Sequence, residues 1–74
     1  MSDARQAISV AREAGASQTA PEPLRAAEDH LASALRELSA SEYKEARKEA
    51  IMAKDKALEA LATAEAASQN QSPN

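Results

Sequence analysis

Few residues of this 74-residue chain have side chains that could carry out chemistry, and His30 is the one imidazole among them. A histidine on a helix binds a metal ion when a second ligand lies three or four residues away on the same face. Positions 26, 27, 33 and 34 hold alanine or serine, so that ligand spacing is missing. We therefore expect a solvated surface histidine, and we expect no metal, no cofactor and no small-molecule substrate.

Carboxylates occur in two pairs with the i,i+4 spacing that places both groups on one helical face, namely Glu45 with Glu49 and Asp55 with Glu59. Lysines lie beside both pairs, which is typical of a solvated face of mixed charge. A catalytic pair would need a cleft that shifts its pKa values, and small alanine side chains build few walls for one. With one histidine and no glycine-rich turn around any serine, a serine nucleophile has no activating base. The sequence predicts that the protein is not an enzyme.

Tyr43 is the only aromatic residue and falls on the apolar face of a predicted helix. We expect it to be a packing anchor that closes a helical hairpin with its hydroxyl at the surface. The alternative is a contact for a partner peptide. Met52 points away from that face and forms a small apolar spot with its neighbour Ile51. Tyr43 and Met52 are therefore the candidate residues for contact with a partner.

The composition indicates one small helical domain with a modest core. The chain has no Trp or Phe and no cysteine, and alanine supplies most of its apolar fraction. Alanine has the highest helix propensity but removes little area from water. The net charge of −3 is spread over residues of both signs, without a basic run, so nucleic acid is not an expected partner. No apolar stretch reaches the roughly 18 residues of a membrane span, and nothing at the start resembles a signal peptide, so we expect the chain as given to be soluble and not to insert into a membrane.

The longest predicted helix covers residues 41–68. Its apolar face follows alternating spacings of three and four residues, which is the period of a helix. Larger residues, Ile51, Leu58 and Leu61, lie on the flank of this face. The members of the face itself are Tyr43, Ala46, Ala50, Ala53, Ala57, Ala60 and Ala64, which we call the alanine stripe.

Two shorter helices are predicted before it. The first covers residues 3–14 and ends because Gly15 can adopt the left-handed conformation that closes a helix. Residues 16–20 lose the apolar period and are predicted to be a loop. The second helix covers residues 21–38 and begins near Pro21 or Pro23, since proline is tolerated in a first helical turn. The domain is predicted to span residues 1–68, followed by a disordered polar tail at 69–74.

The break between the second and third helices is short, which forces the two helices to run antiparallel. Ser39 and Glu42 have the spacing of a capping box, and Ser41 is an alternative N-cap. The predicted fold is all-α: a small three-helix bundle with a long C-terminal helix, in which helices two and three form an antiparallel, tetratricopeptide-like hairpin. We expect the core to consist of Leu24, Leu31, Leu35, Leu38, Tyr43, Ile51, Leu58 and Leu61.

Three stretches carry a resemblance to a known family: ARQAISVAREAGA at residues 4–16, the Ala20-Pro21 step that leads to Leu24, and SEYKEA at residues 41–46. They resemble an uncharacterised α-helical domain of Gram-negative bacterial envelope lipoproteins, often found with an OmpA-like peptidoglycan-binding domain. The sequence departs from that pattern at Thr19, at Ser41-Glu42 and in the absence of a lipidated cysteine. The resemblance implies a periplasmic or outer-membrane-associated location and supplies no activity.

Three functions follow as hypotheses. The first is a non-catalytic helical spacer or protein-interaction module of an envelope lipoprotein, implied by the resemblance. The second is a self-associating alanine zipper, because small residues at helical spacing also allow close packing between chains; we favour packing within one chain. The third is a tetratricopeptide-like hairpin that binds a peptide near Tyr43.

Overall fold

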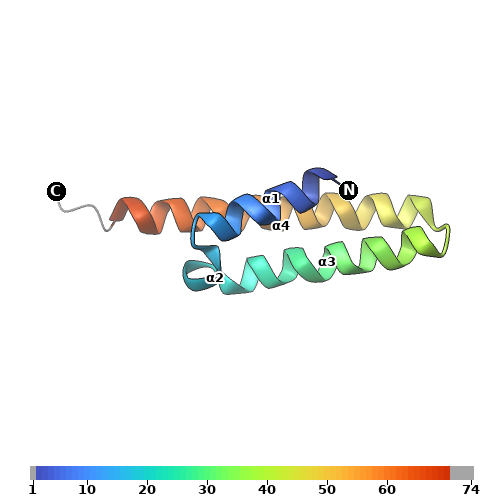
Figure 1. Ribbon diagram of the computed structural model, residues 1–74, viewed down its shortest axis with the longest axis horizontal. Helices are drawn as coiled ribbons and strands as arrows, with labels where there is room; N and C mark the ends of the chain where they lie inside the picture. The colour runs from blue at the N-terminus through green and yellow to red at the C-terminus, as the bar shows by residue number, and fades with distance from the viewer. Residues whose placement is uncertain (1, 71–74) are drawn as a thin grey trace.

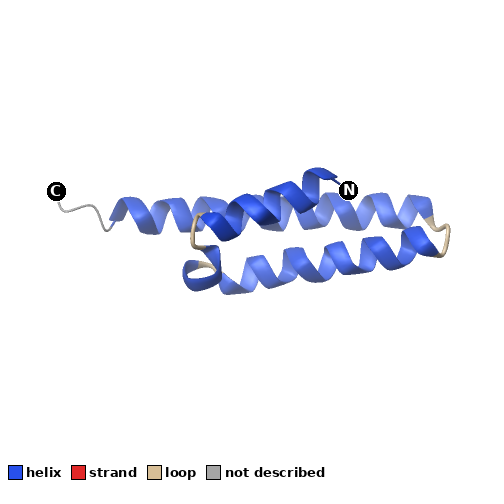
Figure 2. Cartoon of the chain, viewed as in Figure 1, coloured by secondary structure: helices blue, strands red, loops and turns tan. Residues whose placement is uncertain are grey.

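The computed structural model describes residues 2–70, and the side chains of residues 2–68. It contains four helices over this range: α1 (Ser2–Glu13), α2 (Ala16–Thr19), α3 (Pro21–Ser39) and α4 (Tyr43–Asn70). Figure 2 shows helices joined by short loops, with no strand in the part of the chain described. The prediction of an all-α protein is confirmed.

The molecule is elongated, with principal extents of 52 × 17 × 14 Å. Helix α4 is its longest element, and α3 lies beside it in the opposite direction (Figure 1). Helix α1 packs mainly against α4, and runs in the same direction as α4 in this view. At about 1.5 Å of rise per residue, the 28-residue α4 is roughly 40 Å long and extends past α3 at its C-terminal end.

The helix boundaries follow local signals in most places. Gly15 has a φ of 90°, in the left-handed region, and its amide donates to the carbonyl of Arg12, so α1 ends as predicted around this glycine. Pro21 occupies the first turn of α3. The predicted loop at 16–20 is wrong for residues 16–19, because they form the short helix α2. The hydroxyl of Thr19 donates to the Gly15 carbonyl at 3.0 Å and closes this turn.

The predicted capping box between Ser39 and Glu42 is not formed. Ser41 instead has a φ of 62°, and its amide donates to the Leu38 carbonyl at 3.0 Å. The Glu42 amide donates to the Glu37 carbonyl at 2.8 Å, and the two bonds together make a Schellman motif at the end of α3. Glu42 also starts α4, since its carbonyl accepts from the Ala46 amide. Residue 41 therefore serves to end one helix rather than to cap the next.

The C-terminal boundary also differs from the prediction. Helix α4 continues to Asn70, whereas the sequence places its end at residue 68. The remainder of the predicted tail, residues 71–74, lies outside the described residues. The assignment of residues 1–68 to one domain stays a prediction.

The core consists almost entirely of alanine. Of the fourteen buried apolar residues within residues 2–68, twelve are alanines, and the other two are Ile8 and Leu24. The alanine stripe faces the chain's own helices, because Ala46, Ala53, Ala57, Ala60 and Ala64 are at most 1% exposed. Packing within one chain, which we favoured, is therefore observed, and these alanines are not free to form a seam with a second chain.

The predicted leucine-centred core is wrong at most positions. Leu24 is buried and Leu31 and Leu61 are partly buried, as expected. Five other members are 37–61% exposed, namely Leu35, Leu38, Tyr43, Ile51 and Leu58. The distance between packed helices depends on the side chains at their contact, and alanine brings the axes close together. Larger side chains then have no room in the seam and lie along its edges.

Candidate functional site

An apolar hollow with basic residues at its edge lies where α1 begins. It has a cavity volume of about 370 Å³. Because α1 starts at Ser2, and Asp3 lies next to Lys54, α1 leaves the preceding turns of α4 uncovered. We call this hollow the turn groove; its lining residues are Asp3 and Ala4 of α1, Leu38 of α3, and Tyr43, Ala46, Arg47, Ala50, Ile51 and Lys54 of α4.

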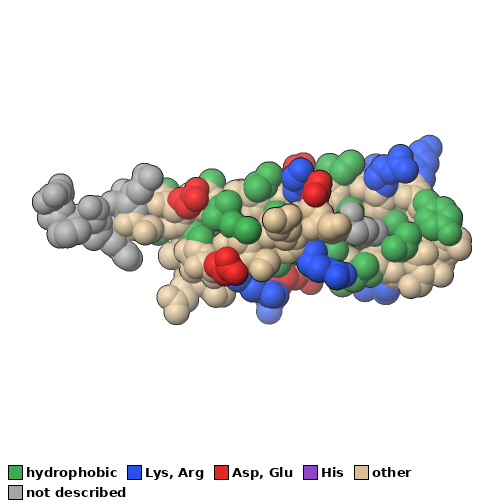
Figure 3. All heavy atoms as spheres, turned by 45° about the horizontal axis from the view of Figure 1, so that its top comes forward, with side chains coloured by type: hydrophobic (Ala, Val, Ile, Leu, Met, Phe, Trp, Pro, Cys, Tyr) green, Lys and Arg blue, Asp and Glu red, His purple; other side chains and the backbone are tan. Residues whose placement is uncertain are grey.

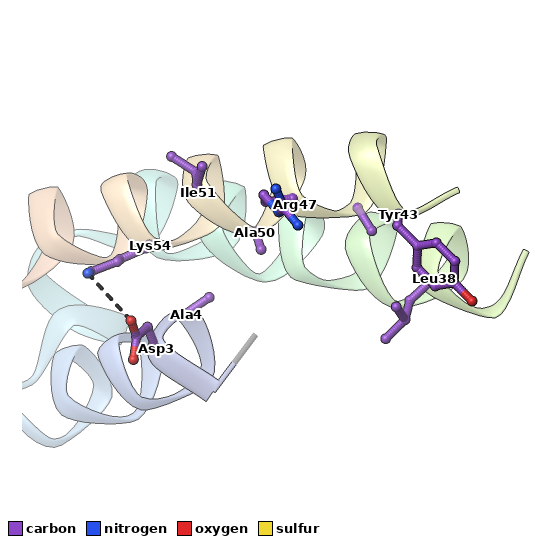
Figure 4. Close-up of a pocket in the computed structure, with 9 residues that line it drawn as sticks. Asp3, Ala4, Leu38, Tyr43, Arg47, Ala50, Ile51 and Lys54 are labelled. Carbon is purple, nitrogen blue, oxygen red and sulfur yellow. Dashed lines mark ion pairs between the residues drawn. The ribbon is translucent and has the colours of Figure 1, made fainter. Parts of the chain in front are cut away.

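The side chains of the turn groove are mainly apolar and small. Figure 4 shows the Tyr43 ring next to Leu38, with its hydroxyl directed outward, while Ala50 lies farther along α4. Tyr43 is 61% exposed and so does not act as the buried anchor that we expected. The predicted outward position of its hydroxyl does hold. The groove can receive an apolar side chain.

Two basic residues lie at the edge of the turn groove. The Lys54 ammonium lies 3.8 Å from an Asp3 carboxylate oxygen, at the limit of an ion pair (Figure 4). Arg47 forms no ion pair within the described part of the chain. Figure 3 shows basic and apolar side chains close together at the end of the molecule that carries the α3–α4 turn. An anionic group beside an apolar one would therefore find partners here.

Ion pairs at each end hold α1 on the other helices. Asp3 contacts Lys54 of α4 near the start of α1, and Arg12 contacts Glu28 of α3 near its end. All four side chains are substantially exposed, so each pair contributes at most about 1 kcal/mol. Burial of Ala4, Ala7, Ile8 and Ala11 supplies the main attachment.

His30 is not the solvated histidine that the sequence predicts. Its Nδ1 lies 2.7 Å from a carboxylate oxygen of Glu49, and both side chains are only about a quarter exposed. The contact joins α3 to α4, so it depends on the register of two helices, which the spacing within one helix does not reveal. No group of three histidine, cysteine or acidic residues suited to a metal ion occurs within residues 2–68.

The titration of Glu37, near the end of α3, is perturbed. Its Oε1 atom is buried and has no hydrogen-bond partner among the described side chains. Burial raises the pKa of Glu37, as do the nearby charges of Glu49, Glu42 and Glu45, whereas Arg36 opposes the shift. The group thus lies in an acidic surface region that disfavours its charged form.

The two carboxylate pairs identified in the sequence have different partners. Glu49 contacts His30, and Glu59 contacts the Lys56 ammonium at 3.3 Å. Glu45 and Asp55 are exposed. In each pair, one carboxylate contacts another side chain and the other is exposed to solvent. This is the arrangement of an ordinary charged surface.

The two candidate partner-contact residues lie in different places. Tyr43 lines the turn groove, and Met52 is 41% exposed but does not line it. The structure brings Tyr43 together with Leu38, Arg47 and Ile51. Sequence reasoning missed this combination, because the start of α1 relative to α4 decides where the groove opens. A role of Tyr43 and Met52 in binding stays a prediction.

Comparison with known proteins gives one family. The family model described as Domain of unknown function (DUF4398) matches residues 1–74. No curated protein and no solved structure matches the chain. Within residues 2–70, none of the helices has the length and apolar character that a membrane crossing requires.

Proposed function

The chain belongs to the family described as Domain of unknown function (DUF4398), and we propose that it acts as a non-catalytic helical spacer or protein-interaction module of a bacterial cell-envelope lipoprotein. The observation that carries the interaction role is the turn groove, where apolar side chains are exposed beside an arginine without an ion-pair partner among the described residues. Exposed apolar side chains gathered at one place are typical of a contact surface.

The elongated shape supports the spacer role. A small three-helix bundle, with α3 and α4 as a tetratricopeptide-like hairpin and α1 packed along α4, would be the structural unit of this spacer. Its length of 52 Å is three times its width. Such a unit can separate two attachment points while presenting a groove at one end. The resemblance to envelope lipoproteins supports the periplasmic or outer-membrane-associated location.

A second candidate is a hairpin that binds a peptide in the turn groove. The position of Tyr43 beside Leu38, in a groove that also includes Ala50, favours it, because a partner side chain could lie against the tyrosine ring. In this case the partner is a short segment rather than a folded surface.

Photo-crosslinking in the native host tests these roles. A photoreactive amino acid replaces Tyr43 in one variant and Gln18, an exposed residue of α2, in the control. We expect the chain in the envelope fraction, with a crosslinked adduct from position 43 that weakens with Leu38→Ala and no such adduct from position 18. A chain confined to the cytoplasmic fraction would contradict the location, and equal adducts from both positions would contradict the groove. The size of the adduct's partner separates a peptide segment from a folded protein.

A further inference from the structure

One side of α4 carries four exposed residues at intervals of seven. Residues seven apart on a helix differ in direction by only about 20°, so they form a line along one side. Ile51 and Leu58, at the centre of this line, are 56% and 45% exposed. Lys44 and Glu65, at its two ends, are also exposed. We call these four residues the outer line of α4. In Figure 4 the Ile51 side chain points away from α1.

The charges of α4 are distributed unevenly along the helix. Residues 43–56 contain five basic and three acidic residues, whereas residues 57–70 contain two glutamates and no basic residue. A helix is stabilised by acidic residues near its N-terminus and basic residues near its C-terminus. The distribution in α4 has the opposite sense, so stability of the single helix does not account for it.

The outer line is complementary to itself when a second copy is reversed. In an antiparallel pair with a two-fold axis between residues 54 and 55, Lys44 of one chain faces Glu65 of the other. Ile51 of one chain then faces Leu58 of the other, and each contact occurs twice, as two-fold symmetry requires. In a parallel pair the same line would place Lys44 against Lys44 and Glu65 against Glu65, which is repulsive.

We infer that the outer line of α4 binds a second copy of this chain, in an antiparallel α4–α4 dimer held by the Ile51–Leu58 and Lys44–Glu65 contacts. The inference rests on the proposed interaction role and names one partner for it. It differs from an alanine zipper, since the alanine stripe is buried on the other side of α4. Only two apolar residues per chain meet in this seam, so the dimer belongs to the class of small interfaces, below about 1,200 Å², which are transient.

Sedimentation equilibrium of the whole chain up to about 1 mM measures this association directly, in the range where a weak dimer forms. We expect reversible dimerisation, and we expect Ile51→Asp to abolish it. Leu35→Asp is the matched control, because Leu35 is an exposed leucine of α3 that lines a hollow toward α1. Circular dichroism verifies that each variant is folded.

The charge contacts allow a sharper test. Lys44→Glu and Glu65→Lys each replace an attraction by a repulsion at both ends of the seam, so each should weaken the dimer about tenfold. Each change also improves the match between the charge and the helix dipole, so neither should unfold the monomer. Mixing the two variants creates two attractive contacts in the heterodimer, and the double variant has them in the homodimer. Both should recover the wild-type affinity.

A monomer at all concentrations overturns the inference, as does a dimer that Ile51→Asp leaves intact or that Leu35→Asp weakens equally. Failure of the mixed variants to recover affinity excludes the antiparallel arrangement and overturns it as well. Ile51 also lines the turn groove, whereas Lys44 and Glu65 do not. The charge variants therefore distinguish loss of the dimer from loss of the turn-groove partner, which the crosslink from position 43 reports.

Discussion

The two halves of α4 carry the same alanine stripe and end in different environments. From Ala53 onward, α1, α2 and α3 all contribute neighbours, and the stripe alanines are almost completely buried. Before Ala53, α3 is the principal neighbour. Ala46 is still buried there, but Ala50 is only partly buried and the turn groove lies open. The comparison teaches that periodicity fixes the direction in which a side chain points, while the number of neighbouring helices decides whether it is covered.

Substitution of two isoleucines should give the largest difference in the free energy of unfolding between the covered and the open region. Ile8 is 4% exposed in the covered region, and Ile51 is 56% exposed in the open one. Ile8→Ala should lower the free energy of unfolding by about 2–5 kcal/mol, because it leaves a cavity. Ile51→Ala should change it by less than about 0.5 kcal/mol. Urea unfolding at a concentration where the chain is monomeric measures both, and equal losses would refute the comparison.

Enlarging an alanine is the opposite kind of substitution. It should also destabilise the covered half of α4 more than the open half. Ala57 is completely buried between helices, so Ala57→Leu should force them apart at a cost of about 1–3 kcal/mol. Ala50 faces the turn groove, where a leucine has space, and Ala50→Leu should be close to neutral. Ala62→Leu, at an exposed position of the same helix, controls for the change in helix propensity. A larger loss at Ala50 than at Ala57 would show that the open half is the more tightly packed one.

Replacing Ser41 by glycine in the turn between α3 and α4 should stabilise the protein. Ser41 has a positive φ, which costs an L-residue roughly 1–2 kcal/mol, and glycine adopts this conformation without that steric cost. Part of the gain is lost to the greater freedom of glycine in the unfolded chain, so we expect Ser41→Gly to stabilise the protein by about 0.5–1 kcal/mol. Thermal unfolding measures the gain. Ala40→Gly, at a neighbouring position with negative φ, is the control and should not stabilise.

The smallest change in stability is expected from substitution of Glu37, which lies near the end of α3 at the open end of the molecule. Its raised pKa means that the folded protein binds this proton more tightly than the unfolded chain does. The contribution of Glu37 to stability is therefore greatest below its ordinary pKa and is lost as the pH rises through the raised value. Glu37→Gln should be more stable than the wild type at about pH 7 and should approach it at about pH 3. Urea midpoints at the two pH values measure this. A difference that does not depend on pH would exclude the electrostatic cause.

Local signals in the sequence predicted much of the fold. Gly15 and Pro21 mark helix ends because glycine readily adopts a positive φ and proline has no amide to donate. Both properties belong to the residue itself and depend little on the rest of the chain. The alanine stripe is visible because its period extends over many turns. In contrast, the exposure of Leu38 and Leu58 depends on how closely neighbouring helices approach, and this is a property of the packed molecule.

The candidate site was predicted only in part. Tyr43 was identified by its type, but its neighbours in the turn groove come from three helices. The contact between His30 and Glu49 depends on the register of α3 against α4. The Schellman motif at Ser41 was missed, because serine seldom adopts a left-handed conformation and its capping spacing indicated a different turn.

A core made of alanine also affects the calorimetry of this protein. The heat capacity of unfolding arises mainly from apolar surface that becomes hydrated, and a methyl group exposes little of it. We therefore expect a heat-capacity change below the usual value of about 12–15 cal/mol/K per residue. The curve of stability against temperature would then be unusually flat. Near its maximum, such a protein keeps almost the same free energy of folding from cold to warm conditions, even if that free energy is small.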